Sequence, residues 1–446
     1  MAKPLDILVV SDLWPPHFVG GYELGAADVC KRLTARGHRV TVLTSTFGVP
    51  GPCREGNVHR VLSETVQGWP DGLGELLRES VGSLKGLRRA RAFLSNARFD
   101  LVYLFNPLGL TASFVQELGE TGRPVVAYVS DNWAAAWPAC DRLLARWFKP
   151  RMALPATREI ALVLLRQAWR RLGVLTRRPD DLPIRHMQFV SRYIHDITVA
   201  RWPELATREI IPWGIDVGRF RIRERRADEL TEWLVVGQVV EHKGVQTVIE
   251  AVQRLRASGH PVRVTFHGTD ATPFARELKE RVARQRCDEY VRFGGPVPRE
   301  QLPDVYDRGG LLVFASMWEE PFSITVLEAF AAGIPVLSTV TGGTPEIVRE
   351  RETATTFRAG DAGHLAARFE DLVQSPGQAL RMAAHARAIV EHHLQIEAMV
   401  DRVEAHLIAV TEGLGSDRIE PFAPGPHPWE AADEAAPALA WPASAS

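Results

Sequence analysis

The chain has 446 residues, with 53 basic and 54 acidic side chains and a formal net charge of −1. Charges this evenly balanced create no bulk field for nucleic acid or anionic membranes, and we expect no nucleic-acid partner. A composition of 46% hydrophobic and 24% charged residues is that of a globular protein of two or three domains, not of a disordered chain.

No apolar stretch approaches the ~18 residues that a membrane span requires. The first apolar run, Leu5–Val10, is interrupted by Asp6, so the sequence predicts neither a signal peptide nor a transmembrane helix. The four cysteines are isolated from one another, which fits neither a disulfide framework nor a zinc site: Cys30, Cys53, Cys140 and Cys287. We therefore expect a cytoplasmic protein.

Short β-rich runs alternate with helical patterns from the start of the chain. Leu5–Val10 is followed by an amphipathic stretch that ends at Gly37 and by the run Val40–Leu43, which is the pattern of a β-α-β unit. Gly20 and Gly21 connect the first strand to the helix, where two glycines permit a close approach of the backbone to a ligand, although a simple tight turn explains them as well. Further strands are expected over Leu101–Phe105, Val125–Val129 and Met187–Val190.

A polar, aperiodic stretch then predicts a linker over 213–231, between an N-terminal domain of residues 1–212 and a C-terminal domain of residues 232–395. The alternation resumes with expected strands at Leu234–Val236, Val262–Phe266, Val291–Phe293, Leu311–Phe314 and Pro335–Ser338. The predicted fold class is α/β, with two doubly wound, Rossmann-like domains facing a cleft that is the expected ligand site.

The C-terminal end divides into two further segments. A terminal helix over 396–416 is expected to pack back on the N-terminal domain. The last segment, 417–446, holds six prolines and nine alanines without apolar periodicity, so we expect a disordered tail.

Neither half contains a Gly-x-Gly-x-x-Gly or P-loop pattern, which argues against nicotinamide-dependent and P-loop chemistry. The most informative segment follows the expected strand Leu311–Phe314. Ser323 is a good N-cap and Gly333 a good stop, so a helix is predicted between them. Its first turn, at Ser323, Ile324 and Thr325, suits a phosphate because free amides and the helix dipole meet there.

Two carboxylates accompany this helix. Glu320 precedes its first turn, and Glu328 is the only charge among apolar neighbours within it. A carboxylate there is costly to bury unless it meets partners such as sugar hydroxyls; the alternative is a glutamate that faces solvent.

Lysine is rare in this chain, which draws attention to Lys243. Only 6 of the 53 basic residues are lysine, and Lys243 follows an expected strand, where a compact charge can reach a diphosphate; a solvated loop lysine is the alternative. Downstream, Thr344 and Pro345 follow Gly342-Gly343 and predict a second helix N-terminus at the same edge, unless these glycines only form a turn.

Together these segments resemble the retaining nucleotide-sugar glycosyltransferases of family 4, which have the GT-B fold. The resemblance covers residues 5–410. Its most specific element is the Glu-x7-Glu pattern, met by Glu320 and Glu328. Supporting matches are Gly20-Gly21, Ile211-Pro212-Trp213-Gly214-Ile215-Asp216, Lys243-Gly244 and Gly342-Gly343-Thr344-Pro345-Glu346.

The resemblance implies a role for each of these residues. Glu328 would bind the ribose hydroxyls of the donor, Lys243 the diphosphate and Glu320 the sugar. The backbone near Ser323, Ile324 and Thr325 would bind the distal phosphate, and Gly20-Gly21 would close over the diphosphate. The base would be read by backbone atoms near 294–297.

Two positions depart from the family pattern. Gln238 stands where the family commonly has arginine, and Ser130 where it commonly has the histidine that contacts the donor sugar. These changes put the sugar specificity in doubt and, less strongly, activity itself.

The implied reaction is retaining transfer of a hexose-type sugar from a nucleotide-diphosphate sugar to an acceptor hydroxyl by front-face substitution. No Asp-x-Asp occurs in the chain, so we expect no metal and no cofactor. The acceptor is open: a saccharide, a lipid-linked molecule or a small aglycone. Two alternatives remain: another GT-B enzyme, such as a nucleotide-sugar 2-epimerase or a phosphorylase, and a catalytically silent subunit that binds nucleotide sugar.

Residues 142–178 hold ten basic residues and one acid, Glu159, a local charge of +9. Apolar residues at 160–165 and at Trp169 and Leu172 accompany them, which is the pattern of a helix lying on anionic lipid. This segment predicts peripheral attachment to the inner membrane face. The alternative is an internal helix whose arginines are solvated or paired.

Overall fold

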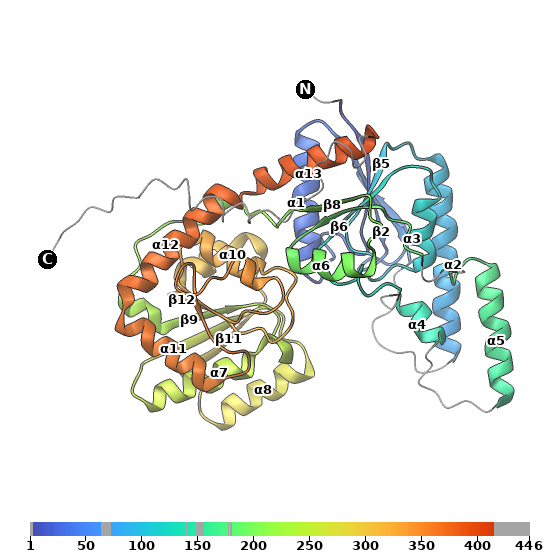
Figure 1. The fold of residues 1–446 in the computed structure, drawn as a ribbon. Coiled ribbons are helices and arrows are strands. Elements are labelled where there is room, and N and C mark those ends of the chain that lie inside the picture. Colours follow the sequence, from blue (N-terminus) through green and yellow to red (C-terminus); the bar gives the residue numbers. More distant parts are fainter. Residues whose placement is uncertain are drawn as a thin grey trace. The chain divides into compact units, whose positions relative to one another are not determined.

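A computed structural model describes residues 3–63, 73–138, 141–148, 156–176, 178 and 181–413, with the backbone alone for 156–161. The chain forms two compact units. Among the described residues, the first unit contains those up to Pro212 together with Met399–Gly413, and the second contains Trp213–Ala398. Each unit is built around its own sheet (Figure 1), as the alternating sequence pattern predicts.

The first unit holds an eight-stranded sheet in the order β3-β4-β2-β1-β5-β6-β7-β8. All neighbouring strands are parallel except β3 and β4. The strands are β1 (Asp6–Val10), β2 (Arg39–Ser45), β3 (Cys53–Glu55), β4 (Val58–Leu62), β5 (Leu101–Leu104), β6 (Val125–Val129), β7 (His186–Phe189) and β8 (Thr207–Ile210). Every residue of β5 and β6 is buried, as expected for central parallel strands with both faces covered.

Six helices accompany this sheet among the described residues. They are α1 (Gly21–Ala35), α2 (Leu73–Asn96), α3 (Ala112–Gly119), α4 (Arg142–Phe148), α5 (Ala156–Arg171) and α6 (Arg192–Arg201). Helix α5 stands beside α2 at the edge of this unit (Figure 1). No helix in the described part of the chain is long and apolar enough to cross a membrane.

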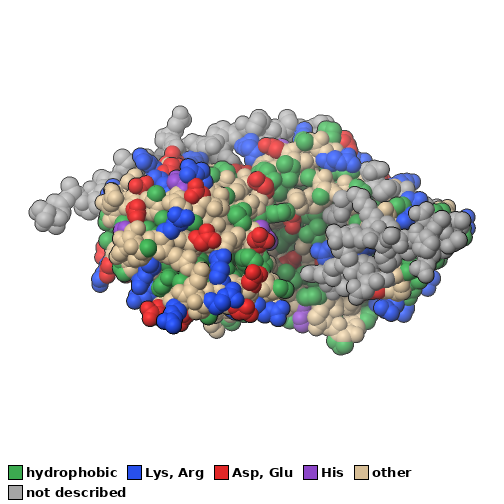
Figure 2. All heavy atoms as spheres, turned by 90° about the horizontal axis from the view of Figure 1, so that it is seen from below, with side chains coloured by type: hydrophobic (Ala, Val, Ile, Leu, Met, Phe, Trp, Pro, Cys, Tyr) green, Lys and Arg blue, Asp and Glu red, His purple; other side chains and the backbone are tan. Residues whose placement is uncertain are grey.

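The second unit holds a six-stranded parallel sheet in the order β11-β10-β9-β12-β13-β14. Its strands are β9 (Glu232–Val236), β10 (Arg263–His267), β11 (Val291–Gly295), β12 (Leu311–Phe314), β13 (Val336–Ser338) and β14 (Thr355–Thr356). Its α-helices are α7 (Val245–Ala257), α8 (Pro273–Arg284), α9 (Leu302–Arg308), α10 (Ile324–Ala331), α11 (Ala362–Gln374) and α12 (Pro376–His393). Figure 2 shows acidic and basic side chains intermixed over the face in view, in keeping with the nearly balanced charge.

The segment expected to be a linker, 213–231, lies within the second unit. It contains the short 3-10 helices η1 (Val217–Arg219) and η2 (Ala227–Thr231). Arg225 is buried and donates hydrogen bonds to the main-chain oxygens of Tyr306, Gly309 and Ala332. These bonds satisfy carbonyls at the ends of α9 and α10 and hold the two helices together.

The last described helix, α13 (Ile396–Thr411), lies in the first unit from Met399 onward, and the tail expected over 417–446 is outside the described residues. Buried His406 joins this helix to the sheet. Its Nδ1 lies 2.9 Å from Gln188 Nε2 and its Nε2 lies 2.8 Å from Thr207 Oγ1. Because the amide of Gln188 donates, the His406 ring must stay neutral, with its proton on Nε2.

This arrangement predicts a loss of stability in acid. Burial lowers the pKa of His406 to about 4, and the nearby His186, whose own pKa is also lowered by burial, adds to the shift. In the unfolded chain this ring binds its proton at a higher pH, about 6.5. The free energy of unfolding is therefore unaffected by the ring above pH ~6.5 and falls between pH ~6.5 and pH ~4, by up to ~3 kcal/mol.

Urea unfolding between pH 7 and pH 4 measures this dependence. The His406→Gln variant should lose part of the slope, whereas replacing the exposed His385 by Gln should leave it unchanged. An identical slope in the His406→Gln variant would refute the assignment.

Candidate active site

Helix α10 begins where its sequence predicts. Ser323 is the N-cap, with its Oγ accepting a hydrogen bond from Val326 N at 3.3 Å, and Gly333 follows the helix with a φ of +64°. The first amides of a helix have no acceptor within it. Ile324 and Thr325 therefore present N–H groups at the positive end of the helix dipole.

Lys243 and Glu320 meet at this end of the second sheet. Lys243 Nζ lies 2.5 Å from Glu320 Oε1, and Ser316 Oγ donates to the same oxygen at 2.5 Å. Glu320 is 7% exposed, and the side chain of Lys243 is 29% exposed. A buried carboxylate thus fixes an ammonium that has two further N–H groups to donate.

The sheet order explains why these two side chains meet. Strand β9 pairs with β10 on one side and with β12 on the other, so the direction of winding reverses at this point. Lys243 follows β9 and Glu320 follows β12. Ligands of open α/β sheets bind outside the carboxyl ends of strands at such a reversal.

Two glycines let the loops approach each other closely. Gly244, with a φ of +68°, follows Lys243, and a β-carbon there would lie 2.0 Å from Ala315 O. Gly342, with a φ of +56°, would place a β-carbon 2.3 Å from Glu320 O. Only glycine fits either position, so both loops are held against the end of β12.

The Gly342-Gly343 loop also binds the carboxylate segment directly. Gly342 N donates to Glu319 Oε2 at 2.5 Å, and Gly343 N donates to Glu320 O at 2.7 Å. The helix N-terminus expected after this loop is a single turn of 3-10 helix, Thr344–Glu346, and its N-cap is Gly343, not Thr344 as expected. The glycines thus position Glu320, and only this one turn of helix follows them.

One of the two sequence interpretations placed Glu328 facing solvent, and the structure differs from it. It is partly buried, and Tyr306 Oη donates to its Oε2 at 2.8 Å. Burial raises the pKa of Glu328, while the hydrogen bond from Tyr306 and the charges of Arg299 and Arg219 oppose that rise. The ionised form of a carboxylate held in this way can accept further hydrogen bonds.

Gln238 lies between β9 and Lys243 and is partly buried. The segment expected to read the base, 294–297, begins in the last two residues of β11, the strand that pairs with β10 in the same sheet. Gly294 packs so closely on the ring of His267 that a β-carbon there would lie 2.4 Å away. The structure thus brings all the expected donor contacts of the C-terminal half to one edge of one sheet.

The remaining expected residues lie together in the first unit. Gly20 N donates to Glu23 Oε2 at 3.1 Å, and Asn106 Nδ2 donates to Glu23 Oε1 at 3.0 Å. Tyr22 Oη donates to Phe105 O at 2.7 Å and lies 3.3 Å from Ser130 N. These contacts tie the Gly20-Gly21 turn to the ends of β5 and β6.

Sequence reasoning missed four of these partners. Glu23 carried a detectable signal, because it lies three residues after the N-cap Gly20 and forms a capping box with it. Tyr306 and Asn106 carried none, since they contact Glu328 and Glu23 from segments distant in sequence. Ser316 lies only four residues before Glu320 in the same loop, but no turn or cap pattern marks this contact.

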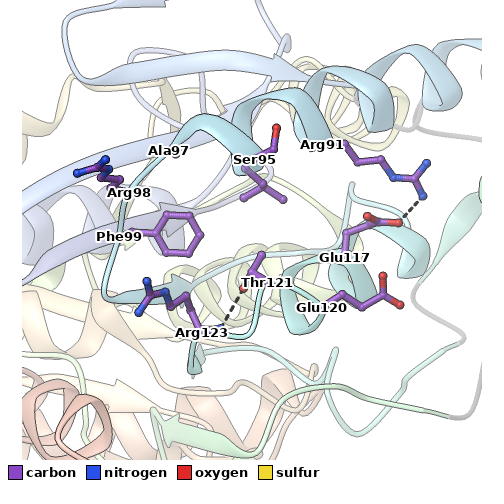
Figure 3. Close-up of a pocket in the computed structure, with 10 residues that line it drawn as sticks. Arg91, Ser95, Ala97, Arg98, Phe99, Glu117, Glu120, Thr121 and Arg123 are labelled. Carbon is purple, nitrogen blue, oxygen red and sulfur yellow. Dashed lines mark hydrogen bonds and ion pairs between the residues drawn. The ribbon is translucent and has the colours of Figure 1, made fainter.

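A cavity of about 450 Å³ lies elsewhere in the first unit, between the C-terminal ends of α2 and α3 (Figure 3). Arg91 and Glu117 form an ion pair at its wall, and Phe99 lies at its base. None of the expected site residues lines it.

Comparisons with known proteins agree with the two-unit architecture. The family model "Glycosyltransferase Family 4" matches residues 19–219, and "Glycosyl transferases group 1" matches residues 218–389. The chain is 27% identical over 398 residues to a glycogen synthase of Mycobacterium tuberculosis, covering 86% of this chain and 89% of the relative. It is 27% identical to a GDP-mannose-dependent alpha-(1-6)-phosphatidylinositol monomannoside mannosyltransferase of Mycolicibacterium smegmatis, over 51% of this chain and 60% of the relative.

Solved structures show the same fold at lower sequence identity. Anabaena Alr3699/HepE, in complex with UDP and glucose, superposes with a TM-score of 0.60 at 17% identity, over 90% of this chain and 99% of that one. Sucrose-phosphate synthase from Thermosynechococcus elongatus superposes with a TM-score of 0.63 at 17% identity, over 92% of this chain and 100% of that one. The two adjoining family matches together span residues 19–389, and these neighbours share the two-unit GT-B fold that the sequence predicts.

Proposed function

We propose that this protein transfers a hexose-type sugar from a nucleotide-diphosphate sugar to an acceptor hydroxyl with retention of configuration. The observation that carries the proposal is the contact between Lys243 and Glu320 beside the first turn of α10. It combines a cation, a buried carboxylate and free amides at a sheet edge suited to a ligand. A structural neighbour in complex with UDP and glucose supports the donor class.

Each side chain has a role matched to its chemistry. Lys243 binds the diphosphate, the amides near Ser323 bind the distal phosphate, and Glu320 accepts hydrogen bonds from sugar hydroxyls. Glu328 accepts from the ribose hydroxyls. Gln238 supplies a neutral amide contact to the diphosphate.

The first unit contributes a second group of contacts in this proposal. Gly20-Gly21 bring a backbone amide to the diphosphate, and Ser130 donates a hydrogen bond to the sugar. The Gly20 amide already donates to Glu23 Oε2, so the diphosphate contact comes from the Gly21 amide. The Ser130 amide stays bonded to Tyr22 Oη, and the Ser130 hydroxyl donates to the sugar.

The reaction is a front-face substitution. The bond between the anomeric carbon and the diphosphate oxygen breaks, and the acceptor oxygen bonds to that carbon on the same face. The acceptor proton moves to the departing diphosphate. Lys243 and the α10 amides stabilise the charge that grows on the leaving group, and positioning supplies much of the remaining acceleration.

NMR of freshly formed product tests the proposal. The new glycosidic bond should have the anomeric configuration of the donor. Inversion would overturn the retaining mechanism, and an epimerised donor without any transfer product would point to the alternative enzyme class.

Turnover should also survive saturating EDTA and gain little from added magnesium or manganese. The reason is that the chain has no Asp-x-Asp to hold a metal-bound diphosphate, while Lys243 can supply the compensating charge. Donor hydrolysis measured with and without chelator gives the answer, and a strict metal requirement would contradict it.

A further inference from the structure

Helix α5 has two apolar faces, and the fold covers only one of them. Leu162 and Trp169 are buried in a cluster with Leu76 of α2 and with Leu143 and Trp147 of α4. Trp147 Nε1 also donates to Ser80 Oγ at 2.9 Å, which fixes α4 on α2. The inner face of α5 is therefore an ordinary part of the core of the first unit.

The outer face exposes apolar side chains to solvent. Val163 is 57% exposed, Leu164 66% and Leu172 44%. Leu164, Ala168 and Leu172 follow one another at intervals of four residues, so they form one line along the helix. Among the described residues, eleven large apolar side chains are exposed, and four of them lie between Phe148 and Leu172.

Arginines accompany this outer strip, which we define as Val163, Leu164, Ala168 and Leu172. The guanidinium groups of Arg166 and Arg170 lie 5.2 and 5.0 Å from the ring centroid of Phe148. Arg171 is exposed and follows them on the same helix. Arg166 Nε also donates to Trp147 O at 2.8 Å, and Arg146 is buried in an ion pair with Glu79.

The chemistry of this surface favours a lipid bilayer as its partner. The strip lies along α5, which stands at the edge of the first unit (Figure 1). An apolar strip with adjacent arginines is suited to the boundary between acyl chains and anionic headgroups, where the leucines lose water and the guanidinium groups bind phosphate. In the sequence, residues 142–178 carry a formal charge of +9, whereas the net charge of the whole chain is −1.

We infer that the outer strip of α5 and its arginines attach this protein reversibly to a bilayer that contains anionic phospholipid. Each arginine near such a surface strengthens binding by roughly fivefold, and the attraction weakens as salt screens it. This attachment does not depend on the transferase activity.

Co-sedimentation of the full chain with vesicles tests the inference. Vesicles of phosphatidylcholine with phosphatidylglycerol should bind the protein at low salt and release it at high salt, whereas pure phosphatidylcholine should bind it weakly. The double variant Leu164→Glu/Leu172→Glu should lower binding by more than ~10-fold. Both residues are exposed, so its thermal midpoint and donor hydrolysis should match those of the unchanged protein.

The matched control is Ile222→Glu, which places the same charge at an apolar side chain that is 70% exposed in the second unit. It should bind vesicles as the unchanged protein does. No sedimentation at low salt, or equal sedimentation of the double variant, would overturn the inference. So would a double variant that only dissociates a self-associated form, because the strip would then be a protein contact.

Discussion

Replacing either Lys243 or Glu320 with alanine is expected to lower turnover by ~10²–10³-fold while the protein remains folded. Each change removes a preorganised charge from the end of the second sheet. Glu320→Ala has a second effect, because Glu320 Oε1 is the acceptor for both Lys243 and Ser316. Without it, the ammonium loses the contact that fixes its direction.

A double-mutant cycle separates the two effects. If Glu320 acts partly by holding Lys243, the double variant should be little slower than the worse single variant, because interacting residues are not additive. The control is Lys279→Ala, which removes an ammonium that also lies 2.5 Å from a carboxylate, that of Asp270, in the same unit. Near-normal turnover for the variants at 243 or 320 would exclude them from the site.

Glu328→Ala is expected to raise the KM for the donor by about 10–100-fold and to change kcat less, because a buried charged acceptor for a ligand hydroxyl is worth ~1.5–3 kcal/mol. The contact is made equally before and during reaction, so its loss weakens binding more than it slows chemistry. Initial rates over a range of donor concentrations separate the two constants. A variant with unchanged KM would remove Glu328 from the donor site.

Tyr306→Phe provides a finer test of the same carboxylate. The hydrogen bond from Tyr306 opposes the rise in the Glu328 pKa, so its loss should raise that pKa further. Because the ionised carboxylate is the form that accepts, donor affinity falls as pH falls through this pKa. The loss should therefore begin at higher pH in the Tyr306→Phe variant, and a superimposable pH profile would contradict the coupling.

Continuous apolar strands were predictable from sequence, whereas strands rich in polar residues were not. Val125–Val129 and Leu311–Phe314 were predicted with the bounds that the structure has, because buried parallel strands are continuous apolar runs. Strands β3, β4, β8 and β14 were missed. Cys53–Glu55 and Thr207–Ile210 are short and largely polar, and pairing with neighbours alone makes them strands.

The site shows the same division. The cap at Ser323 and the turns at Gly244 and Gly342 are local, so sequence could indicate them. The hydrogen bond from Tyr306 to Glu328 joins α9 to α10, and no sequence pattern in either helix predicts it. Sequence also could not divide the basic residues between 142 and 178, one of which serves the core through Glu79 while others remain at the surface.

Helix α13 makes the first unit discontinuous along the chain. His406 of this helix forms hydrogen bonds with Gln188 of β7 and Thr207 of β8. Glu404 of the same helix forms a hydrogen bond with His38. When residues 1–212 have been synthesised, the first unit therefore still lacks α13 and the hydrogen bonds that this helix provides. In the part of the chain that the structure describes, the second unit is the continuous segment Trp213–Ala398, so it can finish folding first during synthesis, and the first unit must wait for α13.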